Sequence, residues 1–397
     1  MTLVLGREVG ASERERPSQN IVRQPTERLA YIDNIRWTMI ILVLSMHASD
    51  TYSPFGNWYF TDRGQAGMGT ILTFGIYQSF LQAFFMALLF FISGYFATSS
   101  LDRKGGTRFA KDRFIRLGLP TLLYMLVIGP LTQYFLSHTW GTGGFVHQWF
   151  VHLFDGEWLS NSGPMWFCAA LLIFSLAYAW LSPWIRANRM TEPPLPGNAA
   201  ISVFILLMAC ATFVTRIVLP EGVSILNMHP GDFPQYILMF GAGVAASRGR
   251  WLEQFPVRFA SRWCFVALGS SVLLLAALLI MRYVLHSNVD YEGGFSVASG
   301  IRSLWEAFVC IGMSLGLIAL YRQFFDRQGR AARFLSENAF AVYLFHAPVL
   351  IALAIAFRSL GAPPLVKAGI LTVAAAIATY AASAVVLRKI PLLRQIL

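Results

Sequence analysis

The chain has 397 residues, of which 56% are hydrophobic and only 13% are charged, and its net charge is +11. Because a soluble protein carries about twice that charged fraction, the composition excludes an ordinary soluble domain and predicts a polytopic membrane protein. The basic residues lie between apolar segments and form no stripe interleaved with aromatic residues, so we expect no nucleic acid as a partner.

The chain begins with a polar region of mixed charge, residues 1–34, which predicts a poorly ordered cytoplasmic arm. This arm contains no hydrophobic stretch followed by a small-residue cleavage site, so the first span is expected to act as its own insertion signal. Asp33 or Asn34 is a plausible N-cap for the helix that follows. Asp33 also lies three residues before Arg36 and can pair with its guanidinium group.

The first apolar span, residues 35–52, carries two polar landmarks. Arg36 stands at its start and His47 follows eleven residues later. Eleven helical steps of about 100° return both side chains to nearly the same face, separated by about 16 Å along the axis. A histidine inside a membrane span is costly, so His47 is a candidate functional residue, with hydrogen-bonded packing as the alternative. We expect no Asp or Glu of this helix to orient His47, and Ser45, Ser49 or another span would have to do so.

Nine further apolar runs are each long enough to cross about 30 Å of hydrocarbon. They cover residues 70–98, 117–136, 164–185, 199–219, 233–247, 263–285, 301–321, 337–357 and 365–387. With the first span they predict an all-α bundle of about ten transmembrane helices, in which the run at 233–247 is short for a full crossing. Most of the 31 Lys and Arg residues fall in alternate connections, and this bias predicts that both termini are cytoplasmic.

The second and third spans meet at the most basic loop of the chain. Ser93 and Gly94, near the end of the second span, are explained either by close helix packing or by lining a cavity. Arg113 and Arg116 are three residues apart on one face of a helix that enters the membrane, and their forked guanidinium groups suit phosphate. Positive-inside anchoring is the alternative explanation for this loop.

The outer loop at residues 137–163 is rich in histidine and tryptophan. Its histidines, His138, His147 and His152, do not have the spacing of one helical face, so we expect no metal site. The four cysteines lie in different apolar segments without a Cys-x-x-Cys pair, so they are expected to form neither disulfides nor metal sites. The indole rings of the loop would form an interfacial belt or bind a sugar.

Two later spans carry polar side chains that have local explanations. Arg302 and Glu306 are four residues apart and are expected to pair. Ser336 could cap the ninth span. His346 precedes Pro348, and a purely structural histidine would bond the carbonyl group that the proline leaves free.

Together these landmarks resemble the acyltransferase 3 family. The motifs are, in chain order, Tyr31-Ile32-Asp33-Asn34-Ile35-Arg36 followed after ten residues by His47, Phe91-x-Ser93-Gly94-Tyr95, Arg113-x-x-Arg116 with Pro120, Gly163-Pro164-Met165-Trp166-Phe167, and Ser336-x-x-Ala339-x-x-x-Tyr343-x-x-His346-x-Pro348. The resemblance covers residues 28 to about 390, and residues 110–170 look most like the branch that modifies glucans and related polysaccharides. Trp37 and Met46 depart from the commonest pattern of the family.

The resemblance implies a membrane O-acyltransferase domain at residues 35–387, followed by a cytoplasmic tail at 388–397. Such an enzyme takes an acyl group, here acetyl or succinyl, from cytoplasmic acyl-CoA and delivers it to a hydroxyl group of an extracytoplasmic glycan. Acyl-CoA would be a co-substrate, with no permanently bound cofactor. The protein would sit among the lipids of a bacterial inner membrane, and the prediction leaves room for a homodimer.

The expected roles follow from this resemblance and from the residue chemistry. His47 would be the general base on the acceptor hydroxyl, by direct transfer or through an acyl-histidine, and Arg36 would hold phosphate at the inner face. The expected acyl-CoA contacts are Arg113, Arg116, Ser93 and Gly94, and the expected substrate contacts are His346, Tyr343, Trp166 and Asp33. The competing class is a transporter or flippase of a polar or lipid-linked solute, which intramembrane Arg and His residues would also suit. A pH-sensing receptor is a third class.

Overall fold

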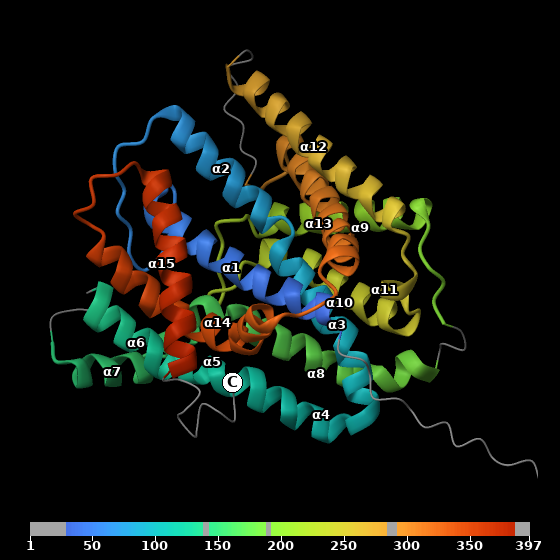
Figure 1. Ribbon diagram of the computed structural model, residues 1–397, viewed down its shortest axis with the longest axis horizontal. Helices are drawn as coiled ribbons and strands as arrows, with labels where there is room; N and C mark the ends of the chain where they lie inside the picture. Colours follow the sequence, from blue (N-terminus) through green and yellow to red (C-terminus); the bar gives the residue numbers. More distant parts are fainter. Residues whose placement is uncertain (1–28, 138–142, 188–191, 284–291, 386–397) are drawn as a thin grey trace, which may run out of the picture.

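The computed structural model describes residues 29–137, 143–187, 192–283 and 292–385 (Figure 1). The predicted arm up to residue 28, the predicted tail at 388–397 and His138 lie outside these ranges. Within the described residues the regular secondary structure is helical, apart from one isolated bridge between Ile225 and Met228. The prediction of an all-α fold is therefore confirmed.

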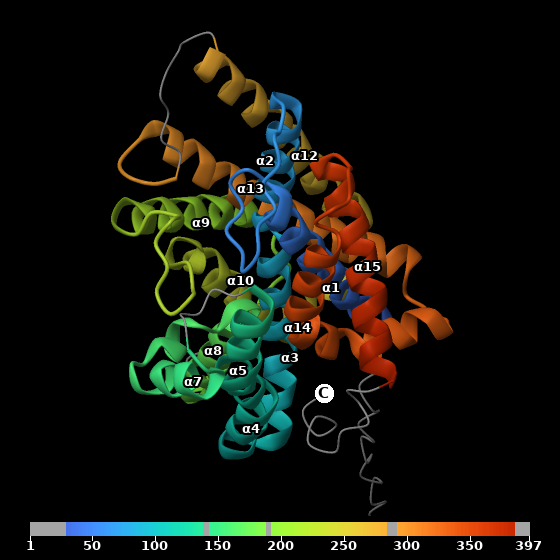
Figure 2. The same cartoon turned by 90° about the vertical axis from the view of Figure 1, so that its left-hand side faces the viewer.

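Among the described residues, ten long helices form the body of the molecule. They are α1 (Ala30–Tyr52), α2 (Met68–Gln82), α3 (Phe85–Lys104), α8 (Trp166–Ala187), α9 (Asn198–Val218), α10 (Phe233–Arg248), α12 (Val257–Tyr283), α13 (Val297–Phe324), α14 (Arg330–Ala356) and α15 (Pro364–Val385). Shorter helices are α4 (Gly106–Arg113), α5 (Leu119–Leu123), α6 (Gly129–Thr132), α7 (Phe145–Phe154) and α11 (Trp251–Gln254). The short helices α4, α5 and α7 gather with α8 at one side of the molecule, away from α12 (Figures 1 and 2).

Eight helical stretches of the described chain are long and apolar enough to cross a membrane. They are Met68–Lys104, Gly106–Leu136, Gly163–Ile185, Asn198–Val218, Val257–Ala277, Val297–Phe324, Arg330–Ala356 and Pro364–Val385. The other two predicted spans are also helices. Of these, α1 carries several ionisable side chains, and α10 has 16 residues and is therefore only about 24 Å long. The chain is a polytopic, all-α membrane protein.

Two of the predicted runs are interrupted. The second is broken between α2 and α3, where the side chain of Gln235 donates a hydrogen bond of 2.5 Å to the carbonyl oxygen of Ala83. The third contains π-helical turns at Phe114–Gly118, Tyr124–Ile128 and Gln133–Ser137. The first two of these turns come just before Pro120 and Pro130, because proline lacks an N–H and its ring pushes away the carbonyl of the preceding turn.

Helices α3 and α10 pack backbone against backbone. A Cβ atom on Gly94 of α3 would clash with the carbonyl oxygen of Phe240, and one on Gly243 of α10 would clash with that of Phe91. Such close approach needs glycine on both helices. Close helix packing therefore accounts for Gly94, which was also predicted to contact acyl-CoA.

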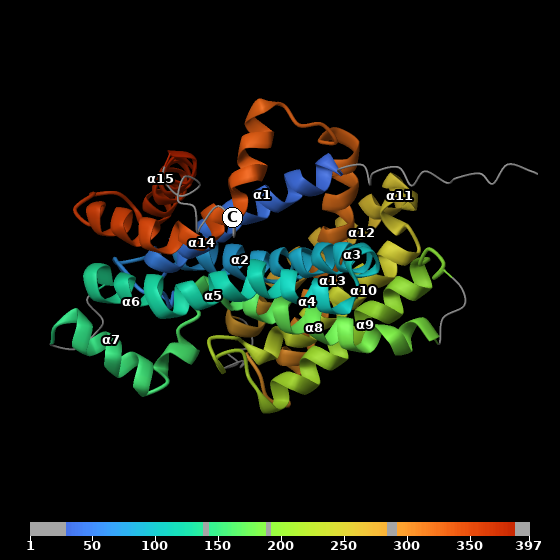
Figure 3. The ribbon, with the colours of Figure 1, turned by 90° about the horizontal axis from the view of Figure 1, so that it is seen from below.

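Helix α1 runs through the middle of the bundle and contacts α2, α3, α13, α14 and α15 (Figures 1 and 3). It begins at Ala30, so the prediction that Asp33 or Asn34 caps it is wrong. Asn34 is buried instead, and its amide donates to the carbonyl oxygens of Phe325 at 2.7 Å and Arg327 at 3.2 Å. Ser336 is likewise no cap, because α14 begins six residues earlier. In both places the helix extends further toward the N-terminus than apolarity alone indicated.

Candidate active site

His47 lies in the last third of α1 and is oriented by an acid from its own helix. Its Nδ1 atom is 3.3 Å from Oδ2 of Asp50, and the other carboxylate oxygen accepts a 2.9 Å hydrogen bond from Gln78 of α2. Because a carboxylate only accepts, Nδ1 of His47 carries the proton and Nε2 presents a lone pair. The prediction that no acidic residue of this helix orients His47 is therefore wrong. The spacing of three residues was already visible in the sequence.

Two further rings lie nearly parallel to the imidazole of His47. The indole of Trp58 stacks on it with a centroid separation of 3.8 Å and an interplanar angle of 14°. The imidazole of His346, from α14, lies 5.4 Å away at 15°. The side chain of His47 remains 18% exposed, whereas that of His346 is fully buried. The structure thus brings two of the predicted site residues together, and it adds Trp58, which the sequence analysis did not select.

His346 is held by the backbone of its own helix. Its Nδ1 atom lies 2.7 Å from the carbonyl oxygen of Tyr343, so Nδ1 is the donor and Nε2 is left as a buried acceptor without a protein partner. The carbonyl that Pro348 leaves free belongs to Leu344, so the predicted bond to that carbonyl is wrong. The hydroxyl group of Tyr343 donates to the carbonyl oxygen of Pro164.

Arg36 marks the other end of α1. Its Nη1 atom lies 3.1 Å from Oδ1 of Asp33, which confirms the predicted pairing, and its guanidinium sits 4.7 Å from the ring centroid of Phe96. The side chain is 39% exposed, so it remains accessible to a ligand. Arg36 and His47 therefore stand about 16 Å apart along one helix.

Arg113 and Arg116 extend this cationic end. Arg113 is half-buried, and the positive charges of Arg116 and Arg36 both act on it, so the three guanidinium groups are electrostatic neighbours. The adjacent acid, Asp112, is paired with Lys104. Like charges held together repel one another unless an anion lies among them. This cluster, defined by Arg36, Arg113 and Arg116, is suited to bind phosphate groups.

Two further residues, Ser93 and Trp166, were predicted to contact acyl-CoA and the substrate, respectively. Ser93 is half-buried in α3. Trp166 packs against Phe90 and Tyr236, with ring centroids 6.5 and 5.6 Å away. It is the next residue, Phe167, whose ring lies 6.2 Å from that of Tyr343. Pro164 and Phe167 of the motif at 163–167 therefore both contact Tyr343, whose carbonyl oxygen bonds His346.

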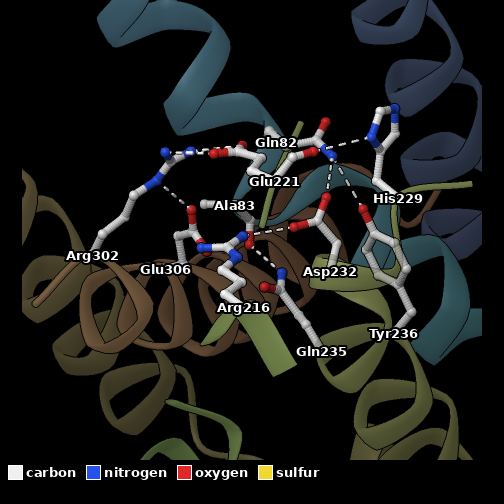
Figure 4. A network of polar contacts seen from close by, with 10 residues as sticks. All are labelled: Gln82, Ala83, Arg216, Glu221, His229, Asp232, Gln235, Tyr236, Arg302 and Glu306. Carbon is white, nitrogen blue, oxygen red and sulfur yellow. Dashed lines mark hydrogen bonds and ion pairs between the residues drawn. The ribbon is translucent and has the colours of Figure 1, made fainter. Parts of the chain in front are cut away.

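A second group of buried charges lies where α9, α10 and α13 meet (Figure 4). Arg302 pairs with Glu306 at 2.9 Å, as predicted, and with Glu221 at 2.5 Å. Arg216, only 1% exposed, pairs with Asp232 at 2.6 Å and with Glu306 at 2.7 Å. Arg216 was not among the predicted site residues, although an arginine late in an apolar run is a visible signal.

This network, defined by Arg216, Glu221, Asp232, Arg302 and Glu306, also fixes the break after α2. Gln82 donates to Asp232 at 3.2 Å and to the hydroxyl group of Tyr236 at 3.1 Å. In the loop after α9, burial and the neighbouring carboxylates of Glu306 and Asp232 raise the pKa of Glu221 to about 7, against the opposing effect of Arg302. Each of the two guanidinium groups is paired with two of the three carboxylates, which indicates a structural role for the network.

Side chains of α7 contact the backbone of the preceding helical stretch. Trp149 of α7 donates to the carbonyl oxygen of Leu126 at 2.7 Å, and Nε2 of His152 lies 3.3 Å from that of Met125. Among the described residues, no group of three or more His, Cys, Asp or Glu side chains could hold a metal ion. The four cysteines, all within these ranges, are free.

Comparison with known proteins gives a family match over most of the chain. The family model described as Acyltransferase domain matches residues 29–388. Among the curated relatives are the Glucans biosynthesis protein C of Salmonella schwarzengrund (strain CVM19633) and that of Salmonella heidelberg (strain SL476). Each is 27% identical over 342 residues, covering 82% of this chain and 83% of the relative. The Glucans biosynthesis protein C of Salmonella dublin is 28% identical over 344 residues with the same coverage. No solved structure matches the chain.

Proposed function

Because the chain belongs to the acyltransferase 3 family and is thus a membrane acyltransferase, we propose that it moves an acetyl or succinyl group from cytoplasmic acyl-CoA to a carbohydrate hydroxyl outside the cytoplasm. The relatives named Glucans biosynthesis protein C support a glucan as the acceptor. The observation that carries the proposal is the division of α1 into a cationic end at Arg36 and an oriented histidine at His47.

The cationic end suits the donor. The phosphate groups of acyl-CoA are multiply charged and cannot cross the hydrocarbon core, so they must stay at the cytoplasmic face. The cluster of Arg36, Arg113 and Arg116 would hold them there, and the extended pantetheine arm would carry the thioester along α1 toward His47. This arrangement requires both termini in the cytoplasm and, in a bacterium, the inner membrane.

The histidine end suits the chemistry. The Nε2 lone pair of His47 would remove the proton from the acceptor hydroxyl, whose oxygen then attacks the thioester carbonyl carbon. The C–S bond breaks as the ester forms, and the imidazolium returns the proton to the leaving CoA thiolate. Asp50 would stabilise the imidazolium and hold the tautomer that leaves Nε2 free. The same atom could alternatively accept the acyl group first, as an acyl-histidine.

The competing transporter hypothesis finds less support. A transporter would use intramembrane charges to bind or relay its solute. In the described chain, the buried charges of the network in Figure 4 are paired with one another. A specific observation in favour of solute transport is lacking among the described contacts.

The test is acyl transfer in membranes supplied with isotopically labelled acetyl-CoA or succinyl-CoA, with the products examined by mass spectrometry. Wild type should place label on a glycan hydroxyl, and His47→Ala should abolish it while CoA still binds. Arg36→Ala should instead weaken binding of the donor. Matched controls are His147→Ala on exposed α7 and Arg258→Ala at the exposed start of α12. Unchanged transfer in His47→Ala would remove histidine from the mechanism, and no transfer from either donor would refute the proposed donors.

A further inference from the structure

A group of uncharged polar side chains meets the loop that follows α1, at the end of this helix that is remote from Arg36. The hydroxyl group of Tyr59 donates to Oδ1 of Asn161 at 3.2 Å, and Gln133 donates to the same oxygen at 2.8 Å. The hydroxyl of Tyr124 donates in turn to that of Tyr59 at 3.4 Å. In the loop after α1, burial raises the pKa of Tyr59 to about 12, so its phenol keeps the proton that it donates.

These side chains adjoin the candidate active site. The ring of Tyr59 meets that of Trp58 edge to face, with centroids 5.0 Å apart, and Trp58 stacks on His47. Gly163 has a φ angle of +49°, and a Cβ atom there would come within 2.5 Å of the Tyr59 hydroxyl. A chain of contacts therefore leads from His47 back to His47, and we call its members the contact ring. They are His47, Trp58, Tyr59, Gly163, Pro164, Tyr343 and His346.

Three buried polar atoms of the contact ring and of Asn161 lack a protein partner. They are Nε1 of Trp58, Nδ2 of Asn161 and Nε2 of His346. Oδ1 of Asn161 accepts the hydrogen bonds from Tyr59 and Gln133, so Nδ2 is the atom of this amide that is left as a donor. Asn161 is only 9% exposed, so its amide is buried beside the site. Buried donors and acceptors are normally satisfied, and those that are not call for a ligand or water.

We propose that Trp58, Tyr59 and Asn161 form the subsite that binds the sugar ring of the acceptor, next to the base His47. This inference rests on the proposed function and names where its acceptor binds. The subsite offers two N–H donors and flat aromatic rings, and the neighbouring Nε2 of His346 offers one acceptor, which is the pattern that recognises a neutral, hydroxylated ring. Its side chains carry no positive charge, so it is unsuited to the phosphates of CoA, which the cationic end of α1 attracts.

The experiment measures binding without the acyl donor. The full chain, purified in detergent or nanodiscs, is titrated calorimetrically with neutral glucose oligomers in the absence of acyl-CoA. Wild type should bind them, and Asn161→Leu should weaken binding by about 3- to 10-fold, as expected for the loss of one neutral hydrogen bond. Trp58→Phe should give a similar loss, because it keeps a six-membered aromatic ring against His47 and removes the N–H together with the rest of the five-membered ring. Binding of CoA should be unchanged in both variants.

The control is Asn198→Leu, which removes a different side-chain amide. The oxygen of that amide accepts a hydrogen bond of 3.2 Å from the indole of Trp263. This variant should bind the oligomers as wild type does. Absence of oligomer binding by wild type would overturn the subsite, as would full affinity in both Trp58→Phe and Asn161→Leu. Should Asn161→Leu fail to fold, the affinities of Trp58→Phe and Tyr59→Phe for the oligomers decide whether the subsite binds them. Oligomer binding without acyl transfer would refute the proposed donor chemistry and still support the subsite. Acyl transfer without oligomer binding would support the donor chemistry and refute the subsite.

Discussion

The substitution Asp50→Asn tests the orientation of His47 most directly. In the protein Gln78 donates to Oδ1 of Asp50 at 2.9 Å, while Oδ2 lies 3.3 Å from Nδ1 of His47. An asparagine would turn its oxygen toward the donating amide of Gln78 and its NH₂ toward His47. The imidazole would then have to accept at Nδ1 and carry its proton on Nε2, which is the tautomer that cannot act as a base.

The expected loss is large because the change alters both the tautomer and the charge. In serine proteases an Asp orients the catalytic histidine in the same way, and its replacement by Asn lowers turnover by about 10⁴-fold. Here the contact is 3.3 Å long and the Asp50 side chain is 18% exposed, so we expect a smaller fall, of about 10² to 10³-fold. Neither the KM for acyl-CoA nor the thermal stability should change much.

The assay is the rate of labelled acyl transfer in membranes with matched amounts of enzyme. The control is Asp62→Asn, since Asp62 pairs with Lys367 at 3.0 Å and is similarly exposed, at 24%. A second variant sharpens the test. In Asp50→Asn combined with Gln78→Glu, the new carboxylate accepts from the asparagine NH₂ and turns its oxygen back toward His47, so part of the rate should return. A rate within threefold of wild type in Asp50→Asn alone would refute the reasoning.

Two further predictions concern stability. Gly94→Ala should lower the free energy of unfolding by about 1–3 kcal/mol, because its Cβ would meet the backbone of α10, and thermal melting should register this while Gly241→Ala, where a Cβ meets nothing within 4 Å, should not. Equal melting temperatures for the two variants would contradict the packing argument. Glu306→Ala should cost about 3–5 kcal/mol, because it removes one carboxylate partner from each of the buried Arg216 and Arg302. Exposed Glu253→Ala is the control, and a stable Glu306→Ala protein would show that the network contributes little.

The sequence by itself determined the class of protein and the presence of a cation and a histidine on the first helix. Long apolar runs can satisfy their backbone in a membrane only as helices, which is why the all-α prediction held. The period of 3.6 residues placed Arg36 and His47 on one face and paired Asp33 with Arg36 and Arg302 with Glu306. The same local rule would have found Asp50, three residues from His47. Contacts within one helix depend on spacing alone.

Only the tertiary structure decided which distant residues meet these landmarks. Trp58 and His346 reach His47 from a loop and from α14, and Arg216 meets Glu306 across two helices. The break between α2 and α3 also lies inside an unbroken apolar run and is held by Gln235, 152 residues away. Such contacts depend on how helices cross and where a chain turns, which is set by packing over the whole molecule and leaves no periodic signal along the chain.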